Sequence, residues 1–414
     1  MSDFPHFAGL TVRGVCLAVV LAACLIVSLW GASVSWATSQ PVLIPNRWTC
    51  STGDASSGCV SVTLAPMPTG RARLAVATGQ DGRVYALGGC TDPNCATPVG
   101  AVEVYDPNTN TWACSVGDLS AGCTSTSIPA IPTARDGLVA AVGPGGQIYA
   151  IGGENGTTQV YSNVEAYDPS TNAWACSVGD LSPGCSTLDL APMPTARARL
   201  ALVVGKDGKF YAFGGCNQTV NGIACGNSLP TIEVYDPNAN TWTCSTDDTS
   251  SAGCTTKALA PMPTPRSLHG GALGPDNRIY AIGGWDGLTN VYSGVETYDP
   301  IVNAWTTESS LSAARFGLGA VTGADGRIYA IGGCSGITDC NALSSVEAYS
   351  TKSGTWTAST RMPTARGRLA ATMGPDRHLY ALGGYANSTR LSTVEAFVVP
   401  LAAYLPSVSS GSPQ

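Results

Sequence analysis

Fourteen of the sixteen cysteines in the chain form seven close pairs along the sequence. Cysteine pairs of this kind can either bind a zinc ion as thiolates or form disulfides. The spacings differ from pair to pair and only three histidines accompany them, which favours disulfides over zinc. We therefore expect seven local bridges and no metal site. The pairs are Cys50/Cys59, Cys90/Cys95, Cys114/Cys123, Cys176/Cys185, Cys216/Cys225, Cys244/Cys254 and Cys334/Cys340.

A second group of residues could bind a charged ligand. Arg73, Arg199 and Arg368 each stand two residues after an Arg that recurs along the chain. An Arg side chain presents a planar fork of donors that matches a carboxylate. The three arginines therefore predict an anionic ligand, such as an acidic sugar or a carboxylate-bearing peptide. The alternative is that they pair with acidic neighbours such as Asp136 or Glu154.

Other positions that depart from the repeated pattern add polar and aromatic side chains to the same predicted site. His269 stands where five other copies of the pattern have Leu, although a lone His is more often structural than a ligand. Trp285, Asp286 and Tyr385 stand in segments where other copies have Cys. The ligand-binding candidates are Arg73, Asp136, Glu154, Arg199, His269, Trp285, Asp286, Arg368 and Tyr385.

Six copies of one sequence pattern must position these residues. Each copy has a Tyr-Ala-apolar-Gly-Gly segment and then a Val/Ile-Glu-x-aromatic segment, and five copies continue to a Trp and the recurring Arg. Residues that recur in every copy, such as Arg71 and Glu103, are best explained as polar contacts of the scaffold. Asp81-Gly82 and Asp106-Pro107-Asn108 provide turns between short strands. The strands expected in the first copy, named a to d in chain order, are 71–78, 83–87, 102–105 and one that starts at Trp112.

This pattern resembles the Kelch repeat, whose signature is a double Gly followed by a Tyr and a Trp at fixed spacing. The resemblance covers residues 46–400 and implies an all-β, six-bladed propeller with one four-stranded antiparallel blade per repeat. The last copy lacks its Trp strand, whereas Trp48 precedes the first copy at the spacing that Trp112 and Trp174 have from the next recurring Arg. We expect the Trp48 strand to pair with the C-terminal a-b-c strands and close the ring.

The expected topology places the cysteine pairs on one side of the propeller. In an antiparallel blade, the b–c and d–a connections lie on one face and the a–b and c–d turns on the other. All seven pairs fall in b–c or d–a connections, so this disulfide-braced loop face is the predicted binding face. The alternative is that these loops only brace the outer strands.

The N-terminal residues predict where in or outside the cell the protein is located, and the charge composition limits its partners. Residues 14–37 are largely apolar without a charged side chain, which predicts an export signal within residues 1–37. An uncleaved membrane anchor and lipidation at Cys24 are alternatives, and all three place the rest of the chain on the cell surface or outside the cell. Residues 401–414 are expected to form a flexible tail. The net charge is −7 without a Lys/Arg run, which argues against nucleic acid as a partner.

These observations favour a non-catalytic, monomeric propeller that binds a carbohydrate or an extracellular protein without a cofactor. The alternative is a sugar-active enzyme on the same scaffold, resembling a sialic-acid mutarotase, a hydrolase or a lyase. Copper chemistry of the galactose-oxidase type is disfavoured, because His269 and His378 lie in different repeats without a supporting Tyr/Cys motif.

Overall fold

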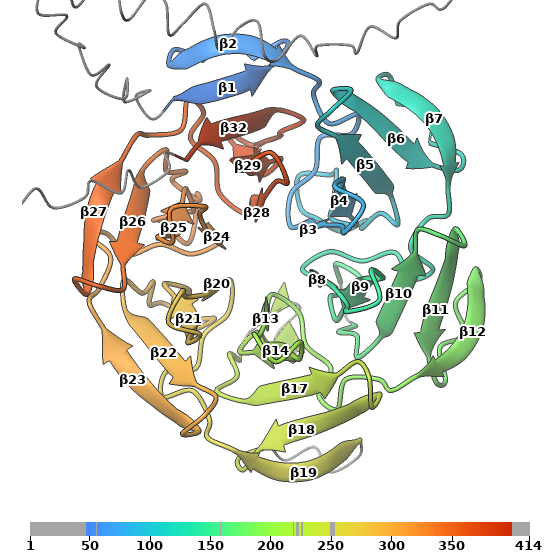
Figure 1. The fold of residues 1–414 in the computed structure, drawn as a ribbon, viewed down its shortest axis with the longest axis vertical. Helices are drawn as coiled ribbons and strands as arrows, with labels where there is room; N and C mark the ends of the chain where they lie inside the picture. Colours follow the sequence, from blue (N-terminus) through green and yellow to red (C-terminus); the bar gives the residue numbers. More distant parts are fainter. Residues whose placement is uncertain are drawn as a thin grey trace, which may run out of the picture. The chain divides into compact units, whose positions relative to one another are not determined.

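The computed structural model describes residues 47–399 except 55, 119, 158, 218, 221–222, 225–226 and 249–252. Every regular element among these residues is a β-strand, and six blade sheets stand around a central axis (Figure 1). Residues of all six blades line a cavity on this axis, which we call the channel. The predicted all-β, six-bladed propeller is therefore confirmed. No helix in the described part of the chain has the length and apolar character needed to span a membrane. The predicted export segment, residues 1–37, and the predicted tail, residues 401–414, lie outside the described residues.

Within each blade the strands follow one another from the channel outward (Figure 1). Blade 1 contains β3 (Ala75–Thr78), β4 (Val84–Leu87), β5 (Val102–Asp106), β6 (Thr111–Ser115) and β7 (Cys123–Ile128). Blade 2 contains β8 (Val139–Val142), β9 (Ile148–Ile151), β10 (Val164–Asp168), β11 (Ala173–Ser177) and β12 (Cys185–Leu190). Blade 3 contains β13 (Ala201–Val204), β14 (Phe210–Phe213), β17 (Ile232–Asp236), β18 (Thr241–Ser245) and β19 (Cys254–Leu259).

The remaining blades follow the same order, with the last one built from both ends of the described chain. Blade 4 contains β20 (Gly270–Leu273), β21 (Ile279–Ile282), β22 (Val295–Asp299) and β23 (Ala304–Glu308). Blade 5 contains β24 (Gly319–Thr322), β25 (Ile328–Ile331), β26 (Val346–Ser350) and β27 (Thr355–Ser359). Blade 6 contains β28 (Ala370–Met373), β29 (His378–Leu382), β32 (Val394–Val398), β1 (Trp48–Ser51) and β2 (Cys59–Leu64). Two small hairpins are β15 (Thr219–Val220) with β16 (Ile223–Ala224) and β30 (Tyr385–Ala386) with β31 (Thr389–Arg390).

The ring closes as the sequence predicts. Strand β1 pairs antiparallel with β32, and Trp48 lies opposite Phe397 with the ring centroids 5.0 Å apart. The indole N–H of Trp48 donates to the carbonyl of Thr360 in the adjoining blade at 3.1 Å. The first strand of the described chain therefore completes the last blade.

Four blades carry a fifth strand that the sequence analysis does not predict. Strands β2, β7, β12 and β19 each pair in parallel with the Trp strand of their own blade at its outer edge (Figure 1). Most of their side chains face solvent, and β7, β12 and β19 show no hydrophobic alternation that would indicate a strand. The corresponding disulfides, such as Cys114–Cys123, join the fourth strand to the fifth. The prediction that these four pairs brace a binding face is therefore corrected, since they fasten the outer edge of the blade.

Packing between blades depends on the second strand of each repeat. Residues Val84–Leu87 of β4 are buried along their whole length, as are the equivalent residues of the other five blades. The double Gly that follows lets neighbouring backbones approach closely. At Gly88, with φ of +60°, an added Cβ would lie 2.5 Å from the carbonyl oxygen of Arg135 in the next blade. The recurring Gly is therefore a packing requirement of the ring.

The recurring Arg and Glu form one buried ion pair in each blade. In blade 1 the Arg71 Nη2 lies 2.7 Å from the Glu103 Oε2, and neither side chain is exposed. Arg71 also donates to the carbonyls of Gly88 and Ala101, which ties three segments of the blade together. The structure thus agrees with the predicted scaffold role of these residues. The equivalent pairs are Arg135–Glu165, Arg197–Glu233, Arg266–Glu296, Arg315–Glu347 and Arg366–Glu395.

Candidate functional site

A closed ring of backbone hydrogen bonds encircles the channel just before the innermost strands. Each blade contributes one residue, and its N–H donates to the carbonyl of the equivalent residue in the preceding blade over 2.6–3.0 Å. All six residues have φ between 51° and 62°, a left-handed conformation that L-residues other than Gly, Asn and Asp rarely adopt. We call this set the backbone ring. Its members are Arg73, Gly137, Arg199, Leu268, Gly317 and Arg368.

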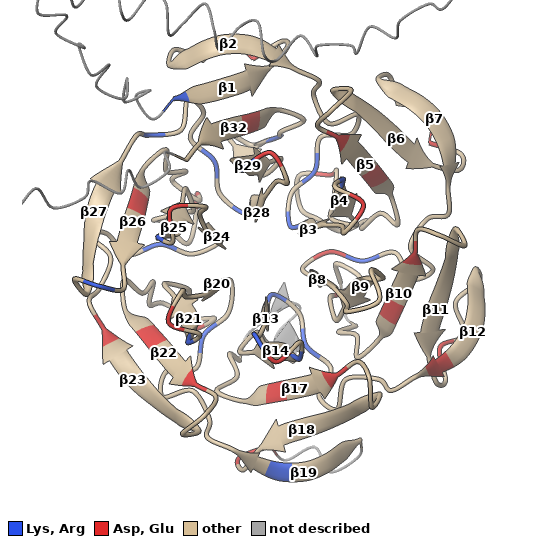
Figure 2. Ribbon diagram, viewed as in Figure 1, with Lys and Arg blue, Asp and Glu red and all other residues tan. Residues whose placement is uncertain are grey.

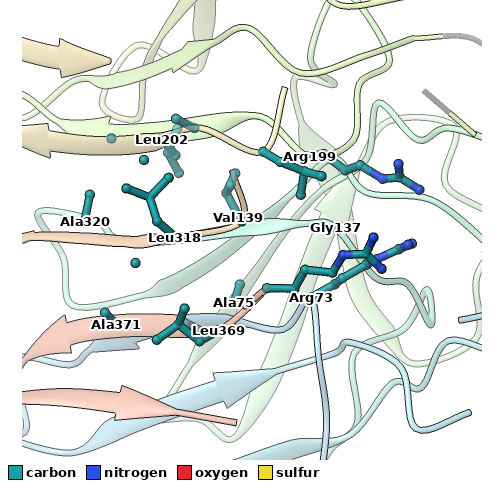
Figure 3. A pocket seen from close by; sticks show the side chains of 18 of the residues that line it. Arg73, Ala75, Gly137, Val139, Arg199, Leu202, Leu318, Ala320, Leu369 and Ala371 are labelled. Atoms are coloured by element: carbon teal, nitrogen blue, oxygen red, sulfur yellow. The ribbon is translucent and has the colours of Figure 1, made fainter. Parts of the chain in front are cut away.

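The channel on one side of the backbone ring is apolar. The residue that follows each ring member is a Leu in five blades and His269 in blade 4, and these side chains are at most 7 % exposed. Together with small residues such as Ala75 and Ala371 they line a cavity of about 190 Å³. Figure 3 shows the side chains of Arg73 and Arg199 extending away from this apolar lining. The charged groups of the ring therefore gather at one mouth of the channel.

Two of the three predicted ligand-binding arginines pair with acidic residues of the protein. The Arg73 Nη1 lies 3.3 Å from the Asp136 Oδ1 and 3.2 Å from the Glu154 Oε1. The Arg199 Nη2 lies 2.7 Å from the same Glu154 oxygen. Asp136 and Glu154 are held side by side by a β-bridge between their backbones. For Arg73 and Arg199, the structure thus shows the alternative interpretation, in which the arginines pair with internal carboxylates.

Arg368 differs from the other two. Among the described residues, its guanidinium has no hydrogen-bond or ion-pair partner, and its Nε is buried. Burial, followed by repulsion from Arg73, Arg199 and Arg390, lowers the pKa of Arg368 to about 9. Arg368 is partly exposed, and a cation that lies among other cations lacks a counter-charge within the described part of the protein. Figure 2 shows positively charged segments meeting around the channel near β3, β13 and β28.

Arg390 is a further member of the mouth that the sequence analysis missed. It lies on β31 with its guanidinium 4.7 Å from the ring centroid of Tyr385, a cation–π geometry. Its Nη2 donates to the carbonyl of Asp92 at 3.0 Å, whereas its buried Nε and Nη1 have no hydrogen-bond partner. Arg390 stands in the b–c loop of blade 6, outside the repeated pattern, so alignment of the repeats gives no signal for it.

Of the acidic residues at the mouth, Asp136 has the carboxyl group whose pKa is shifted furthest. Burial raises the pKa of its carboxyl to about 7, with attraction to Arg73 acting against repulsion from Glu154. The side chain has no exposed surface. Its second oxygen, Oδ2, is buried without a hydrogen-bond partner. Asp136 is therefore poised to change charge near neutral pH, although solvent does not reach it directly.

The opposite part of the mouth is aromatic. The rings of Trp285 and Phe316 lie 6.0 Å apart, and both pack with Tyr385 against the bridged pair Cys334–Cys340. The indole N–H of Trp285 is buried and has no hydrogen-bond partner. Blades 4, 5 and 6 thus contribute aromatic side chains to the mouth of the channel. Blades 1, 2, 3 and 6 contribute its charged side chains.

The two remaining candidates lie away from the charged cluster. The His269 ring packs 5.2 Å from Phe213 and is 5 % exposed, on the apolar side of the backbone ring. Burial, followed by repulsion from Arg266, lowers its pKa to about 3, so the imidazole is neutral. Asp286 accepts hydrogen bonds from the backbone N–H groups of residues 288–290 and so shapes its own loop.

The structure pairs the cysteines as predicted wherever both partners are described. Six of the seven predicted pairs are disulfides, and Cys216 is bridged as well, although its predicted partner Cys225 lies outside the described residues. The disulfides Cys90–Cys95 and Cys334–Cys340 lie in b–c loops at the mouth. The backbone of Cys90 forms a β-bridge with Ala72, the residue before the ring member Arg73. The two disulfides fasten the loops that surround the charged and aromatic groups.

Comparison with known proteins agrees with this architecture. The Kelch motif family matches residues 71–114, 138–176, 197–247, 267–312 and 315–363. The Kelch repeat-containing protein kel-10 of Caenorhabditis elegans is 30 % identical over 42 % of this chain and 25 % of its own length. Kelch-like protein 36 of Mus musculus is 27 % identical over 63 % of this chain and 35 % of its own length. The matched regions span between 15 % and 36 % of the length of curated relatives of this kind.

A solved structure shares the fold. The protein titled "Structure of YjhT" superposes with a TM-score of 0.59 at 16 % sequence identity, covering 81 % of this chain and 95 % of that one. The matched repeats make up more than half of this chain, and the sixth blade, which those matches do not reach, has the same strand order. This chain is therefore a member of the Kelch-repeat family of β-propellers.

Proposed function

We propose that this protein is a non-catalytic binding module that holds a carboxylate-bearing ligand at the mouth of its channel. The observation that carries the proposal is the unpaired guanidinium of Arg368 among three further arginines. Among the described residues, four guanidinium groups face three carboxylates there, those of Asp136 and Glu154 and that of Asp92 near Arg390. A ligand carboxylate would provide the counter-charge and accept hydrogen bonds from the N–H groups of Arg368 and Arg390 that have no partner within the described part of the protein.

The aromatic part of the mouth suits the remainder of such a ligand. Trp285 and Tyr385 offer flat apolar surface, and the buried Trp285 N–H is a vacant donor. An acidic sugar or an acidic peptide side chain would place its carboxylate over Arg368 and its carbon skeleton against these rings. Binding to preformed, disulfide-fastened loops requires little reordering of the protein.

We also propose that the protein acts outside the cytosol. Disulfides persist in oxidising compartments and are rare in the cytosol, and six are present among the described residues alone. The apolar segment of residues 14–37 supports the same location as an export signal, an anchor or a lipidated leader.

One observation favours an enzyme as the second candidate. Asp136 has a pKa near 7, which suits a group that moves protons to and from a sugar. A general acid or base must reach its substrate within hydrogen-bonding distance, however, and the Asp136 side chain is fully buried behind Arg73. The geometry therefore supports binding better than turnover.

An array of acidic and neutral glycans, together with acidic peptides, tests the proposal on the oxidised protein. We expect selective binding of carboxylate-bearing probes, weakened by salt, without chemical change of the bound probe. The arms of the array separate a glycan ligand from a peptide ligand. Selective binding of neutral probes would contradict the proposal, and conversion of a bound sugar would favour the enzyme.

The affinities of variants at Arg368 for the acidic probe then show whether the probe binds at the mouth of the channel. Arg368→Leu introduces the residue that stands at the equivalent ring position 268, and we expect at least about tenfold weaker binding of the acidic probe. Arg368→Lys keeps the charge without the planar fork and should retain part of the affinity. Arg327→Leu, at an exposed turn residue outside the mouth, is the matched control and should bind as wild type. Unchanged affinity in Arg368→Leu would place the ligand elsewhere.

A further inference from the structure

Two neighbouring blades lack the strand that covers the outer edge of the other four. Strands β23 of blade 4 and β27 of blade 5 are the outermost described strands of their sheets and pair on one side only. A strand edge of this kind presents unpaired N–H and C=O groups to another chain. The two bare edges are adjacent along the circumference of the propeller (Figure 1).

The Trp on the fourth strand is more exposed in the two blades that lack a fifth strand. In the four covered blades Trp48, Trp112, Trp174 and Trp242 are at most 1 % exposed. In blades 4 and 5 the equivalent Trp305 and Trp356 are only partly buried.

The comparison between Trp48 and Trp305 identifies the cause. Trp48 has a fifth strand in its own blade but none in the preceding blade, and Trp305 has the reverse arrangement. Trp48 is buried and Trp305 is not, so the strand of the same blade accounts for the full burial. Each bare edge therefore leaves an aromatic surface that an added strand would cover.

A second observation points to the same place. The turn that leads into β23 has Ile301 and Val302 at its tip, with exposures of 92 % and 66 %. The equivalent tips in covered blades carry polar or small residues, such as Asn108 and Thr109 in blade 1. Exposed apolar side chains also occur in covered blades, as at Val116 and Leu181, but here they lie next to a bare strand edge and add apolar surface to it. Blade 4 thus combines a bare edge with an apolar flank.

We propose that β23 and β27 form a docking site for an extended segment of another protein chain, which adds to either blade as a fifth strand. The four covered blades show the chemistry of the segment. It runs parallel to the Trp strand, is rich in Ser and Thr, and ends in Leu or Ile, as in Cys123–Ile128. Main-chain hydrogen bonds provide affinity in this mode of recognition, and apolar contacts with Trp305, Ile301 and Val302 provide selectivity.

Disulfide trapping tests the docking site with a defined probe. The register of the covered blades places a Cys two residues after the Trp, where it bonds to the first residue of the fifth strand. The variants Thr307→Cys and Ala358→Cys create this position on the bare edges. The probe is a synthetic peptide with the sequence of residues 122–130, including Cys123. We expect it to form a mixed disulfide at either edge about ten times more readily than at Ser170→Cys, an exposed turn residue of a covered blade.

The controls separate strand addition from simple thiol reactivity. A peptide with Pro at the positions of Thr124 and Thr126 cannot continue a strand and should lose the preference for the edges. Wild-type protein measures any background reaction. Equal trapping at the edges and at Ser170→Cys, or equal trapping of the proline peptide, would overturn the proposal. A dimer of the wild-type protein that Thr306→Pro dissociates would also overturn it, by making a second copy of the chain the occupant.

Discussion

The backbone N–H of Arg73 donates to the carbonyl oxygen of Arg368 at 3.0 Å, joining the first blade to the last. This is the hydrogen bond that closes the backbone ring, just as the pairing of β1 with β32 closes the outer part of the propeller. Two separate closures, one at the channel and one within blade 6, therefore hold residues from the two ends of the described chain together.

Removal of the outer closure should destabilise the whole propeller. A chain that lacks residues 47–64 loses β1 and β2, exposes the edge of β32 and uncovers Phe397. We expect the thermal midpoint to fall by at least about 10 °C, because several kcal/mol of buried aromatic and strand contacts are lost. Scanning calorimetry measures this change. An unchanged midpoint would show that the inner ring alone holds the blades together.

Arg199 and Arg368 should respond oppositely to the same substitution, although they occupy equivalent ring positions. Arg199→Leu leaves the buried Glu154 with Arg73 as its one remaining ion-pair partner among the described residues, and we expect a loss of about 2 kcal/mol in unfolding free energy. Arg368→Leu removes an unpaired cation among cations, and we expect no loss or a gain of about 1 kcal/mol. Denaturant unfolding compares the two variants. Equal losses would mean that Arg368 has a partner within the protein.

His269→Leu should stabilise the protein, more so in acid. The variant restores the Leu of the other five blades and removes two buried ring nitrogens without partners, a gain of about 1 kcal/mol at pH 7.5. The folded pKa of His269 is about 3, below the unfolded value, so the unfolded chain takes up a proton that the folded protein cannot, and the wild type loses stability as the pH falls from 6.5 toward 3. The advantage of the variant should therefore grow by about 2 kcal/mol between pH 7.5 and pH 5. A pH-independent difference would indicate an imidazole that is already solvated.

Asp136→Asn should show the opposite dependence on pH. The folded pKa of Asp136, about 7, lies above the unfolded value, so the protonated acid stabilises the wild type at low pH and that contribution is lost as the pH rises through 7. Relative to Asp136→Asn, the wild type should lose about 2.6 kcal/mol of unfolding free energy between pH 5 and pH 8. Parallel pH profiles of the two proteins would show that Asp136 stays ionised beside Arg73.

The sequence predicts the propeller well because each repeat must bury the same inner strands. The buried run Val84–Leu87 and the close approach at Gly88 leave little freedom in residue type, so the pattern recurs visibly. The fifth strands are not predictable in this way, since solvent-exposed segments such as Cys123–Ile128 are under no such constraint and resemble polar loops.

The mouth is only partly predictable for a related reason. Equivalent positions identify Arg73, Arg199 and Arg368 as neighbours, because the repeat fixes where each blade meets the channel. Glu154 also occupies a position that recurs in the other blades, so the sequence suggests it as a possible partner, although it does not show which arginines it pairs with. Arg390, beside the third arginine, lies in a b–c loop without a counterpart in other copies, so the pattern contains no information about it.

All six hydrogen bonds of the backbone ring point the same way around the channel. Dipoles arranged head to tail in a closed circle cancel, so the ring itself exerts almost no net field along the axis. The electrostatic character of the mouth therefore comes from side chains, those of the ring together with Asp136, Glu154 and Arg390. Arg, Gly and Leu already occupy these positions in one backbone conformation. Exchanging those side chains would give the same scaffold a different ligand preference, which makes the ring a natural place for selectivity to diverge among related propellers.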